Sequence, residues 1–281
     1  MRFGLFDKQA ARNSTPVWQA LRQGLDRLGM QHASQDTQAD VAIIWSVLWA
    51  GRMRANRDVW KLFRDSGRPV IVAEVGMLDR GRTWKLGING TGGEAIWGQG
   101  LDPNRPTQLG IQLDPWRDQG RDIVICLQRS DSHQWRDQPP VTQWLNQTID
   151  CVRDHTSRSI TVRCHPRQRI SVPYGVGESV CRPVANTYDD FDFDQVLSGA
   201  WAVINWNSGP GVQAVLRGVP AFVGDTSLAA PVANLDLAQI ETPSRPDRSK
   251  WLIDVCHTEW TCPEIATGYP LERLLRSLDS I

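Results

Sequence analysis

The sequence lacks an excess of charge of either sign. Its 281 residues include 31 basic and 31 acidic side chains, and charged residues make up only 22% of the chain. This balance argues against a protein that holds nucleic acid by electrostatics alone. Arginine is nevertheless frequent in the first third of the chain, so a local basic surface stays open.

The sequence also lacks closely spaced cysteines, the pattern of a secretory signal in its first residues, and long apolar runs. The six cysteines are widely separated and show neither a C-x-x-C pair nor the spacing of zinc ligands, so we interpret them as reduced core thiols. The first residues, MRFGLFDKQAAR, do not have the charged-then-apolar pattern of a secretory signal, and no apolar run approaches the roughly 20 residues of a bilayer span. We therefore expect a soluble, cytoplasmic protein without a membrane partner.

Short apolar runs alternate with segments of helical periodicity, which is the pattern of parallel α/β units. Strands are predicted at residues 3–6, 40–47, 69–75, 122–127, 159–164, 201–206 and 221–223. Helices are predicted at residues 14–28, with Ser14 as N-cap, and at 56–64, 141–155, 192–198, 211–217, 249–256 and 271–278. The stretch 76–100 is rich in glycine and charge and has little periodicity, so we predict a loop there.

The length predicts two domains of ordinary size. A polar stretch at residues 114–120 separates the two α/β series, so we place a first, acceptor-binding domain at residues 1–118 and a second, donor-binding domain at 119–265. The last segment, 266–281, is predicted to be a C-terminal helix that packs back on the first domain.

The strongest local motif is a turn with two glycines and a serine between a predicted strand and a predicted helix. Such a turn presents backbone N–H groups and a hydroxyl at a helix N-terminus, where phosphate is favoured. The candidate donor-binding residues of this turn are Asn207, Ser208, Gly209, Gly211 and Gln213. An ordinary tight turn is the alternative interpretation.

A second motif, RCHPR at residues 163–167, ends the strand predicted at 159–164. His165 can donate a hydrogen bond to a diphosphate, and the fork of Arg167 suits phosphate oxygens. A lone histidine of this kind is often structural. Because parallel strands end at the same sheet edge, the two motifs support one another.

Together, RCHPR and WNSGPGVQAVLRGVPAFV (206–223) resemble the donor half of GT-B glycosyltransferases. Several such families, Kdo transferases and bacterial sialyltransferases among them, carry a His-Pro motif, a Ser-rich turn, a helix with Glu-Ala and a Gly-x-Pro. The resemblance covers about residues 122–234 and implies an α/β fold of GT-B type, with two Rossmann-like domains whose parallel sheets face a central cleft. It assigns phosphate binding to His165 and to the turn around Ser208. Gln213 stands where the motif has Glu, which puts a carboxylate contact with the ribose in doubt.

Two further segments are donor-binding candidates. Gln128 and Arg129 follow the strand predicted at 122–127, and the arginine suits a diphosphate while the hydroxyls that follow suit a sugar. Asp225 follows the strand predicted at 221–223 and suits donor hydroxyls. A solvated loop and a helix cap are the respective alternatives.

Direct transfer of a sugar to an alcohol needs a general base, because the hydroxyl loses a proton as the glycosidic bond forms. Glu74 is the first candidate, since it ends a strand that is otherwise apolar. Asp79 is the second and Asp7 the third. The alternative for Glu74 is a structural pair with Arg80 or Arg82.

The acceptor-binding candidates lie in the same domain. Arg80, Arg82, Lys85 and Asn89 suit an acceptor that carries phosphates, Trp84 suits stacking, and Ser46 ends another first-domain strand. No DxD-like pair lies at a strand end of the donor half apart from Asp189-Asp190 and Asp192, which we place at a helix start. We therefore expect no metal or other cofactor, and a monomer that takes a nucleotide-sugar, specifically a UDP-sugar, as donor substrate.

The whole sequence also resembles glycosyltransferase-like proteins of tailed phages, in the phrases IIWSVLWAGRM, VIVAEVGMLDRGRTWKLGING and FVGDTSLAAPVANLDLAQIE. That resemblance implies hydroxymethylated pyrimidines in DNA as the acceptor, and the host cytoplasm as the location if the protein is phage-encoded. A glycan or a lipid-linked sugar is the alternative acceptor. A noncatalytic nucleotide-sugar-binding protein and a sugar epimerase remain alternative functions.

Overall fold

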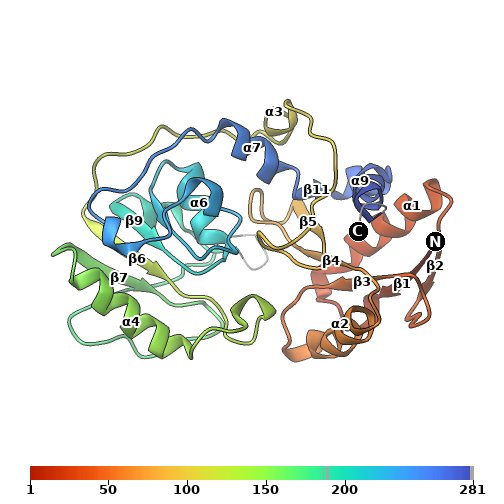
Figure 1. The fold of residues 1–281 in the computed structure, drawn as a ribbon, viewed down its shortest axis with the longest axis horizontal. Helices are drawn as coiled ribbons and strands as arrows, with labels where there is room; N and C mark the ends of the chain where they lie inside the picture. Colours follow the sequence, from red (N-terminus) through yellow and green to blue (C-terminus); the bar gives the residue numbers. More distant parts are fainter. Residues whose placement is uncertain (186, 188–189, 279–281) are drawn as a thin grey trace. The chain divides into compact units, whose positions relative to one another are not determined.

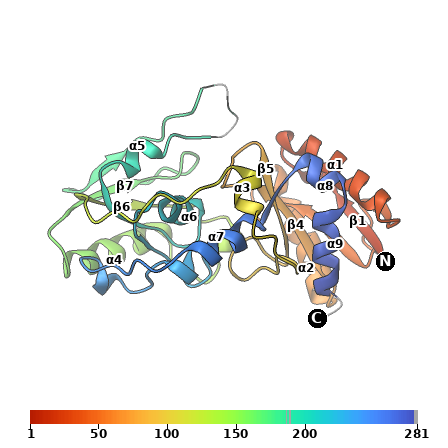
Figure 2. The same ribbon diagram turned by 90° about the horizontal axis from the view of Figure 1, so that it is seen from above.

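The computed structural model describes residues 1–185, 187 and 190–278. In it the chain forms two compact α/β units (Figures 1 and 2). Unit 1 consists of Met1–Leu109, Asp131–Gln134 and Ile253–Ile281, and unit 2 consists of Gly110–Ser130 and Trp135–Leu252.

These bounds differ from those inferred from sequence. Unit 2 begins at Gly110, ahead of the polar stretch used to place the boundary, and it ends at Leu252. The chain returns to unit 1 at Ile253, because the strand and helices that follow belong to the unit 1 sheet and core.

Unit 1 contains, among its described residues, a six-stranded sheet in the order β11-β5-β4-β3-β1-β2. The strands are β1 (Arg2–Phe6), β2 (Gln31–Ser34), β3 (Val41–Trp45), β4 (Val70–Val75), β5 (Thr83–Ile88) and β11 (Glu259–Thr261). The first four are parallel, whereas β5 is antiparallel to β4 and β11 is antiparallel to β5. The helical segments are η1 (Asp7–Gln9), η2 (Arg12–Ser14), α1 (Thr15–Arg27), η3 (Gly51–Ala55), α2 (Asn56–Asp65), α3 (Arg105–Leu109), α8 (Cys262–Ala266) and α9 (Tyr269–Leu278).

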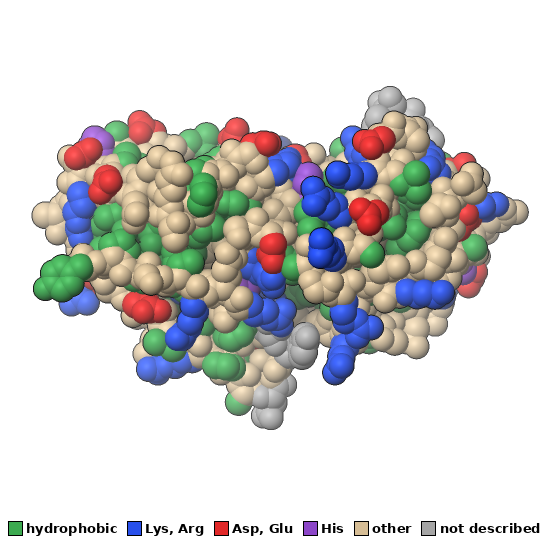
Figure 3. Space-filling model, turned by 90° about the horizontal axis from the view of Figure 1, so that it is seen from below, with side chains coloured by type: hydrophobic (Ala, Val, Ile, Leu, Met, Phe, Trp, Pro, Cys, Tyr) green, Lys and Arg blue, Asp and Glu red, His purple; other side chains and the backbone are tan. Residues whose placement is uncertain are grey.

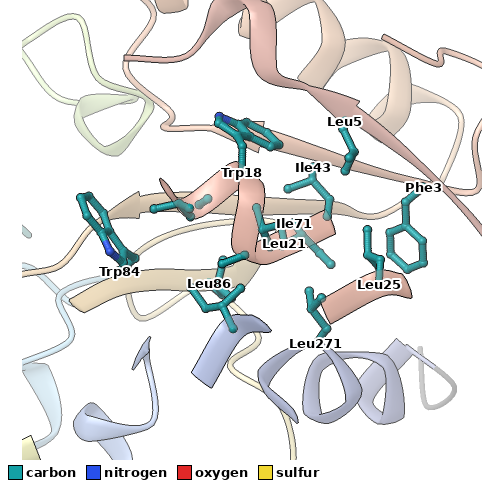
Figure 4. Close-up of a cluster of buried hydrophobic side chains, with 14 of the residues drawn as sticks. Phe3, Leu5, Trp18, Leu21, Leu25, Ile43, Ile71, Trp84, Leu86 and Leu271 are labelled. Atoms are coloured by element: carbon teal, nitrogen blue, oxygen red, sulfur yellow. The ribbon is translucent and has the colours of Figure 1, made fainter. Parts of the chain in front are cut away.

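One face of this sheet carries the larger core of unit 1 (Figure 4). Leu21 and Leu25 lie on one stripe of α1 and pack with Phe3 of β1, Ile43 of β3 and Leu271 of α9. Each of these side chains is fully buried, and such burial stabilises the fold by about 1.5–3 kcal/mol per side chain. The C-terminal helix is therefore part of the unit 1 core.

The other face is covered by α2. Phe63 of this helix packs edge to face on Phe6, with ring centroids 5.9 Å apart, and both lie in a cluster with Val70 and Val72 of β4. Residues 70 and 72 therefore mark the face of β4 on which Glu74 also lies, since alternate residues of a strand share a face.

The predicted loop at 76–100 was wrong in part, because it contains β5. All six residues of β5 are buried, and its glycine, lysine and tryptophan hide the strand pattern. The N-cap predicted for α1 was also wrong in its bonding: Ser14 donates its hydroxyl to the carbonyl of Ala11 at 2.6 Å and makes no capping bond to the described helix.

A buried arginine ties α3 to the final segment of unit 1. The guanidinium of Arg105 donates to the carbonyls of Cys256 and Glu259, at 3.2 and 2.6 Å, and forms an ion pair with Glu264. It also lies 4.0 Å from the ring centroid of Trp260. Neither α3 nor β11 was predicted, because both depend on this contact between segments far apart in sequence.

Unit 2 contains, in its described part, a five-stranded parallel sheet in the order β10-β9-β6-β7-β8. Its strands are β6 (Asp122–Cys126), β7 (Ser159–Arg163), β8 (Gly177–Ser179), β9 (Ala200–Ile204) and β10 (Ala221–Phe222). Its helical segments are α4 (Val141–Arg153), α5 (Asp194–Leu197), α6 (Gly209–Leu216), η5 (Ala230–Val232) and η6 (Leu237–Gln239), while η4 (His133–Trp135) and α7 (Ser249–Cys256) cross the unit boundaries.

This strand order is that of a doubly wound Rossmann-like sheet. The chain starts in the middle at β6, builds outward through β7 and β8, then returns to β9 on the other side of β6. The reversal lies between β6 and β9, and open α/β sheets bind ligands at the carboxyl ends of the strands beside such a reversal. None of the described helices combines the length and apolar composition that crossing a bilayer requires.

Candidate functional site

The loops that follow β6 and β9 are joined by a buried pair of side chains. Gln128 donates from Nε2 to Oδ1 of Asn207 at 2.9 Å, and its Oε1 accepts the backbone N–H of Asn207 at 3.1 Å. Asn207 in turn donates from Nδ2 to the hydroxyl of Thr226, which follows β10, at 3.0 Å. Gln128 and Asn207 are each only 6% exposed, so these bonds fix the loops at the point where the sheet reverses its strand order.

A second link joins the loops that follow β6 and β7. The backbone N–H of Ser130 donates to Oε1 of Gln168 at 2.9 Å, and Nε2 of Gln168 donates to the Ser130 hydroxyl at 2.7 Å. Gln168 also donates its backbone N–H to the carbonyl of His165. The two predicted motifs therefore lie at one sheet edge, two strand spacings or about 10 Å apart, with polar side chains between them.

The ring of His165 is oriented by its own loop. Its Nδ1 accepts the backbone N–H of Arg167 at 3.1 Å. In the neutral ring this bond places the proton on Nε2, which makes that nitrogen a hydrogen-bond donor. A donor here suits an anionic or hydroxyl-bearing ligand.

The turn before α6 has the features of an anion site. Ser208 precedes the helix in an extended conformation, and its hydroxyl makes no capping bond to the described helix. It instead accepts from Nδ2 of Asn205 at 3.2 Å, which leaves its proton to be donated elsewhere. Gly209 and Gly211 lie in the first turn, where N–H groups and the helix dipole favour an anion.

Gly211 is also required by packing. A Cβ atom built there would lie 2.5 Å from Oδ1 of Asn205 and 2.9 Å from Cγ1 of Val223. The glycine therefore lets α6 approach the end of β9 closely.

The remaining donor candidates lie on the same elements. Arg129 is half-buried beside Gln128, Arg167 is exposed after β7, and Gln213 is half-buried in α6. Asp225 is exposed in the loop after β10. Nine of the ten donor candidates thus belong to loops or to the first turn of α6 at the carboxyl ends of β6, β7, β9 and β10, and Gln213 lies one turn further along α6.

The candidate base of unit 1 belongs to a row of charges across the sheet. Glu74 of β4 lies directly opposite Lys85 of β5, and Lys85 lies opposite Glu259 of β11. Opposed residues share a face, so the row runs carboxylate, ammonium, carboxylate. Glu74 is half-buried, whereas Lys85 is 8% exposed and Glu259 is fully buried.

Burial lowers the pKa of Lys85, although the charges of Glu259, Glu74 and Glu94 act in the opposite direction. Its ammonium donates to the carbonyl of Thr91 at 3.4 Å. Lys85 was predicted to bind acceptor phosphates, but its burial within the sheet gives it a structural and electrostatic role instead.

Glu259 organises the loop that follows β4. Its carboxylate accepts the N–H groups of Met77 and Leu78, at 2.7 and 3.1 Å, and the hydroxyl of Thr83 at 2.6 Å. Gly76 is required beside it, because a Cβ there would lie 2.5 Å from Oε2 of Glu259. This residue shapes the loop between Glu74 and Asp79.

The three candidate bases differ in whether they form ion pairs. Asp79 pairs with Arg82 at 2.8 Å. Asp7 pairs with Arg22 at 2.5 Å; burial raises its pKa, but hydrogen bonds led by that from Arg22 outweigh this and lower the pKa overall. Both are thus held as ion-paired carboxylates. Among the described residues, Glu74 accepts only the adjacent N–H of Val75, at 2.8 Å.

The acceptor candidates are brought together only in part. Ser46 follows β3 at the edge where Glu74 ends β4; it is 3% exposed and has a φ of 63°, a strained backbone for a residue other than glycine. Arg80 and Arg82 are exposed in the loop after β4.

Two acceptor predictions were wrong. Trp84 is 6% exposed and packs on Trp45 in the core, with ring centroids 5.7 Å apart, so it offers no face for stacking. Asn89 lies at the opposite end of β4 from Glu74, where its side chain accepts the N–H of Val70 at 3.0 Å. The reason is that β5 runs antiparallel to β4 and carries the chain away from the edge.

The described residues include no group of three or more His, Cys, Asp or Glu side chains arranged to hold a metal ion. Asp189, one half of the acidic pair considered above, lies outside the described residues.

Two solved structures of glycosyltransferases resemble the whole chain. One is the β-Kdo 2,4 transferase of KpsC from Thermosulfurimonas dismutans, with a TM-score of 0.56 and 11% identity over 96% of this chain and 98% of that one. The other is the β-Kdo 2,7 transferase of the same protein, with a TM-score of 0.51 and 11% identity over 97% of this chain and all of that one. No family model matches the sequence, and no curated protein matches it. The likeness shows a GT-B-like α/β fold.

Several polar residues of these edges were missed by sequence reasoning. Asn205 carried a usable signal, since it is a polar residue at the end of a buried strand. Gln168 and Thr226 lie just beyond the motifs. Glu259 gave no signal, because its partners are about 180 residues away in the chain.

Proposed function

We propose that the protein is a glycosyltransferase that moves a sugar from a nucleotide-sugar, specifically a UDP-sugar, to an acceptor hydroxyl. The observation that carries this proposal is the polar edge of unit 2, where Gln128, Asn207, Ser130 and Gln168 join the loops that bear His165 and the α6 turn. The fold shared with two Kdo transferases supports the same reaction class.

In this proposal the donor diphosphate lies against the α6 N-terminus. The N–H groups of the Gly209–Gly211 turn and the hydroxyl of Ser208 donate to its oxygens, and Nε2 of His165 donates from the neighbouring loop. These groups stabilise the negative charge that develops as the bond between sugar and diphosphate breaks. We propose that no metal ion is needed, and activity that survives EDTA would support this.

Glu74 is the proposed general base of unit 1. It takes the proton of the acceptor hydroxyl while that oxygen forms a bond to the anomeric carbon and the nucleoside diphosphate leaves. Its half-exposed carboxylate is not held in an ion pair within 4 Å among the described residues, unlike Asp79 and Asp7. Lys85 lies directly opposite it on β5.

The proposed acceptor is a hydroxymethylated pyrimidine in DNA, with the alternative of a glycan or lipid-linked sugar. Because the two structural neighbours are Kdo transferases, Kdo is an additional candidate for the transferred sugar. A noncatalytic nucleotide-sugar-binding protein is the alternative function.

The test is incubation with a panel of nucleotide-sugars, including UDP-glucose and nucleotide-activated Kdo, and with hydroxymethylcytosine-containing DNA or oligosaccharide acceptors. Mass spectrometry of the acceptor detects the product. Glu74→Gln is expected to abolish transfer without weakening UDP binding, whereas Asp79→Asn keeps most activity. Transfer at the wild-type rate by Glu74→Gln would remove it as the base, and donor binding without any product would favour the binding protein.

A further inference from the structure

A run of unpaired cations lies on the surface of unit 1 immediately after β3. Five basic side chains of η3 and α2 are exposed, against two acidic ones, Asp58 and Asp65, over the same segment. None of the five makes a hydrogen bond or an ion pair with the described residues. The five are Arg52, Arg54, Arg57, Lys61 and Arg64.

The cations of α2 form a single stripe. Arg57, Lys61 and Arg64 are spaced by four and three residues, so they lie on one helical face over a rise of about 10 Å. Asp58 and Asp65 are turned about 100° from Arg57 and Arg64, respectively, and border the stripe beside Lys61, from which they are three and four residues away. Lys and Arg side chains are gathered on the face of the molecule that carries α2 (Figure 3).

An aromatic cluster borders this stripe. Trp60 of α2 lies three residues after Arg57 and four before Arg64, and its ring is 6.1 Å from that of Trp49 and 5.1 Å from that of His133. The rings of Trp49 and His133 are 5.7 Å apart. All three residues are half-buried, so part of each remains exposed.

The cluster is held rigidly. The N–H of Trp49 donates to the carbonyl of Asp131 at 3.0 Å, and the N–H of His133 donates to the carbonyl of Val47 at 2.9 Å. The two tryptophans also pack against the core beneath α2. Rings fixed in this way lose little freedom when a flat ligand stacks on them.

A row of cations beside fixed aromatic rings matches a ligand that alternates negative charge with flat rings. Single-stranded nucleic acid has this chemistry, because phosphates meet the cations while unpaired bases stack on the aromatic side chains. Acidic polypeptides and acidic polysaccharides carry the charge without aromatic faces, and a duplex hides the faces of its bases. We infer that the η3–α2 surface binds a single strand of nucleic acid.

This surface is connected to the edge that carries Glu74. Asn56, the first residue of α2, is fully buried and donates from Nδ2 to the carbonyl of Trp45, the last residue of β3, at 2.5 Å. A strand on the surface would therefore lie near the carboxyl end of β3. That the strand is the acceptor rests on the proposed function, whereas its binding can be measured without any sugar.

The test is fluorescence anisotropy with labelled dT15 at several salt concentrations. If five phosphates are neutralised, the slope of log K against log salt is expected to be about −3.5, because each contact with a single strand contributes about −0.7. Combined Arg57→Gln, Lys61→Gln and Arg64→Gln should reduce this slope by about 2. The matched control removes the same charge elsewhere: Arg12→Gln, Arg27→Gln and Arg153→Gln should leave the slope unchanged.

A separate variant tests whether bases stack on the aromatic cluster. Trp49→Leu, which keeps an apolar side chain against the core, should weaken dT15 binding about tenfold, within the range of one lost base stack. Poly-L-glutamate of equal charge should bind at least tenfold more weakly than dT15. Thermal melts show whether each variant is folded.

Three results would overturn the inference: equal loss in the two triple variants, equal affinity for poly-L-glutamate, or no effect of Trp49→Leu in a folded protein. Binding of dT15 as expected without sugar transfer from any donor would instead contradict the proposed function alone. If the protein transfers sugar and the Arg57→Gln, Lys61→Gln, Arg64→Gln variant binds dT15 as the wild type does, this inference alone would be contradicted.

Discussion

Replacement of Gln128 by leucine is the most informative change to the polar edge of unit 2, where the donor is proposed to bind. The substitution keeps a side chain of similar size in a site that is 6% exposed, but removes both hydrogen bonds to Asn207. At about 1 kcal/mol net for each bond, the free energy of unfolding should fall by about 2 kcal/mol. For a protein of this size the melting temperature should drop by about 4–8 °C.

The same change should weaken donor binding, because Asn207 begins the turn that leads into α6. If about 1.4 kcal/mol is needed to reorder that turn, affinity for UDP falls about tenfold. Isothermal titration calorimetry with UDP measures this, and differential scanning fluorimetry measures the melting temperature. Gln143→Leu, an exposed position on α4, is the matched control and should change neither quantity.

The reasoning would be refuted by a folded Gln128→Leu variant that binds UDP as tightly as the wild type. That result would make the Gln128 pair a purely structural contact. A loss of affinity without any loss of stability would instead show that Gln128 contacts the donor directly.

The other predictions concern buried groups. Burial lowers the pKa of Lys85 from its ordinary 10.5, so the unfolded chain binds this proton more tightly than the folded one. The charged side chain therefore reduces the free energy of unfolding at neutral pH, and this penalty disappears as the pH rises toward 10.5. Urea unfolding should show that the stability of Lys85→Met relative to wild type is higher at pH 7 than at pH 10. Glu259→Gln should destabilise unit 1 by about 2 kcal/mol through weaker charge-assisted bonds, and faster hydrogen exchange at residues 77–78 would locate the loss, whereas unchanged exchange would contradict the role of Glu259. Burial raises the pKa of both Cys126 and Cys256 to about 12, so neither thiol should react with iodoacetamide at pH 8 in the folded protein, and rapid alkylation detected by mass spectrometry would disprove this.

The polar edge of unit 2 was largely predictable from sequence, because short stretches of consecutive residues determine it. The strands at 122–127, 159–164 and 201–206 are apolar runs, and the polar residues that follow them must collect at one edge once the strands are parallel. What sequence could not supply was the pairing that fixes the loops. Gln168 was an unremarkable residue until the structure placed it against Ser130.

Unit 1 was less predictable because its sheet is mixed. The parallel strands β1, β3 and β4 were found from their apolar runs, but β2, with the polar sequence QHAS, was not predicted, and β5 carries Lys85 and a glycine in a fully buried strand. Because β5 runs antiparallel to β4, Asn89 lies at the end of the sheet away from Glu74. Because side chains alternate between the two faces of a strand, Trp84 and Lys85 are buried on opposite faces of β5. Pairing with β11 joins residues about 175 positions apart, which no local pattern reveals.

We propose that the turn before α6 and the loop after β7 jointly hold a diphosphate. A crystal structure of the protein with bound UDP is the decisive measurement. We expect diphosphate oxygens within hydrogen-bond distance of the Ser208 hydroxyl, the first N–H groups of α6 and Nε2 of His165. Density for UDP at another place, or none there at saturating concentration, would contradict it.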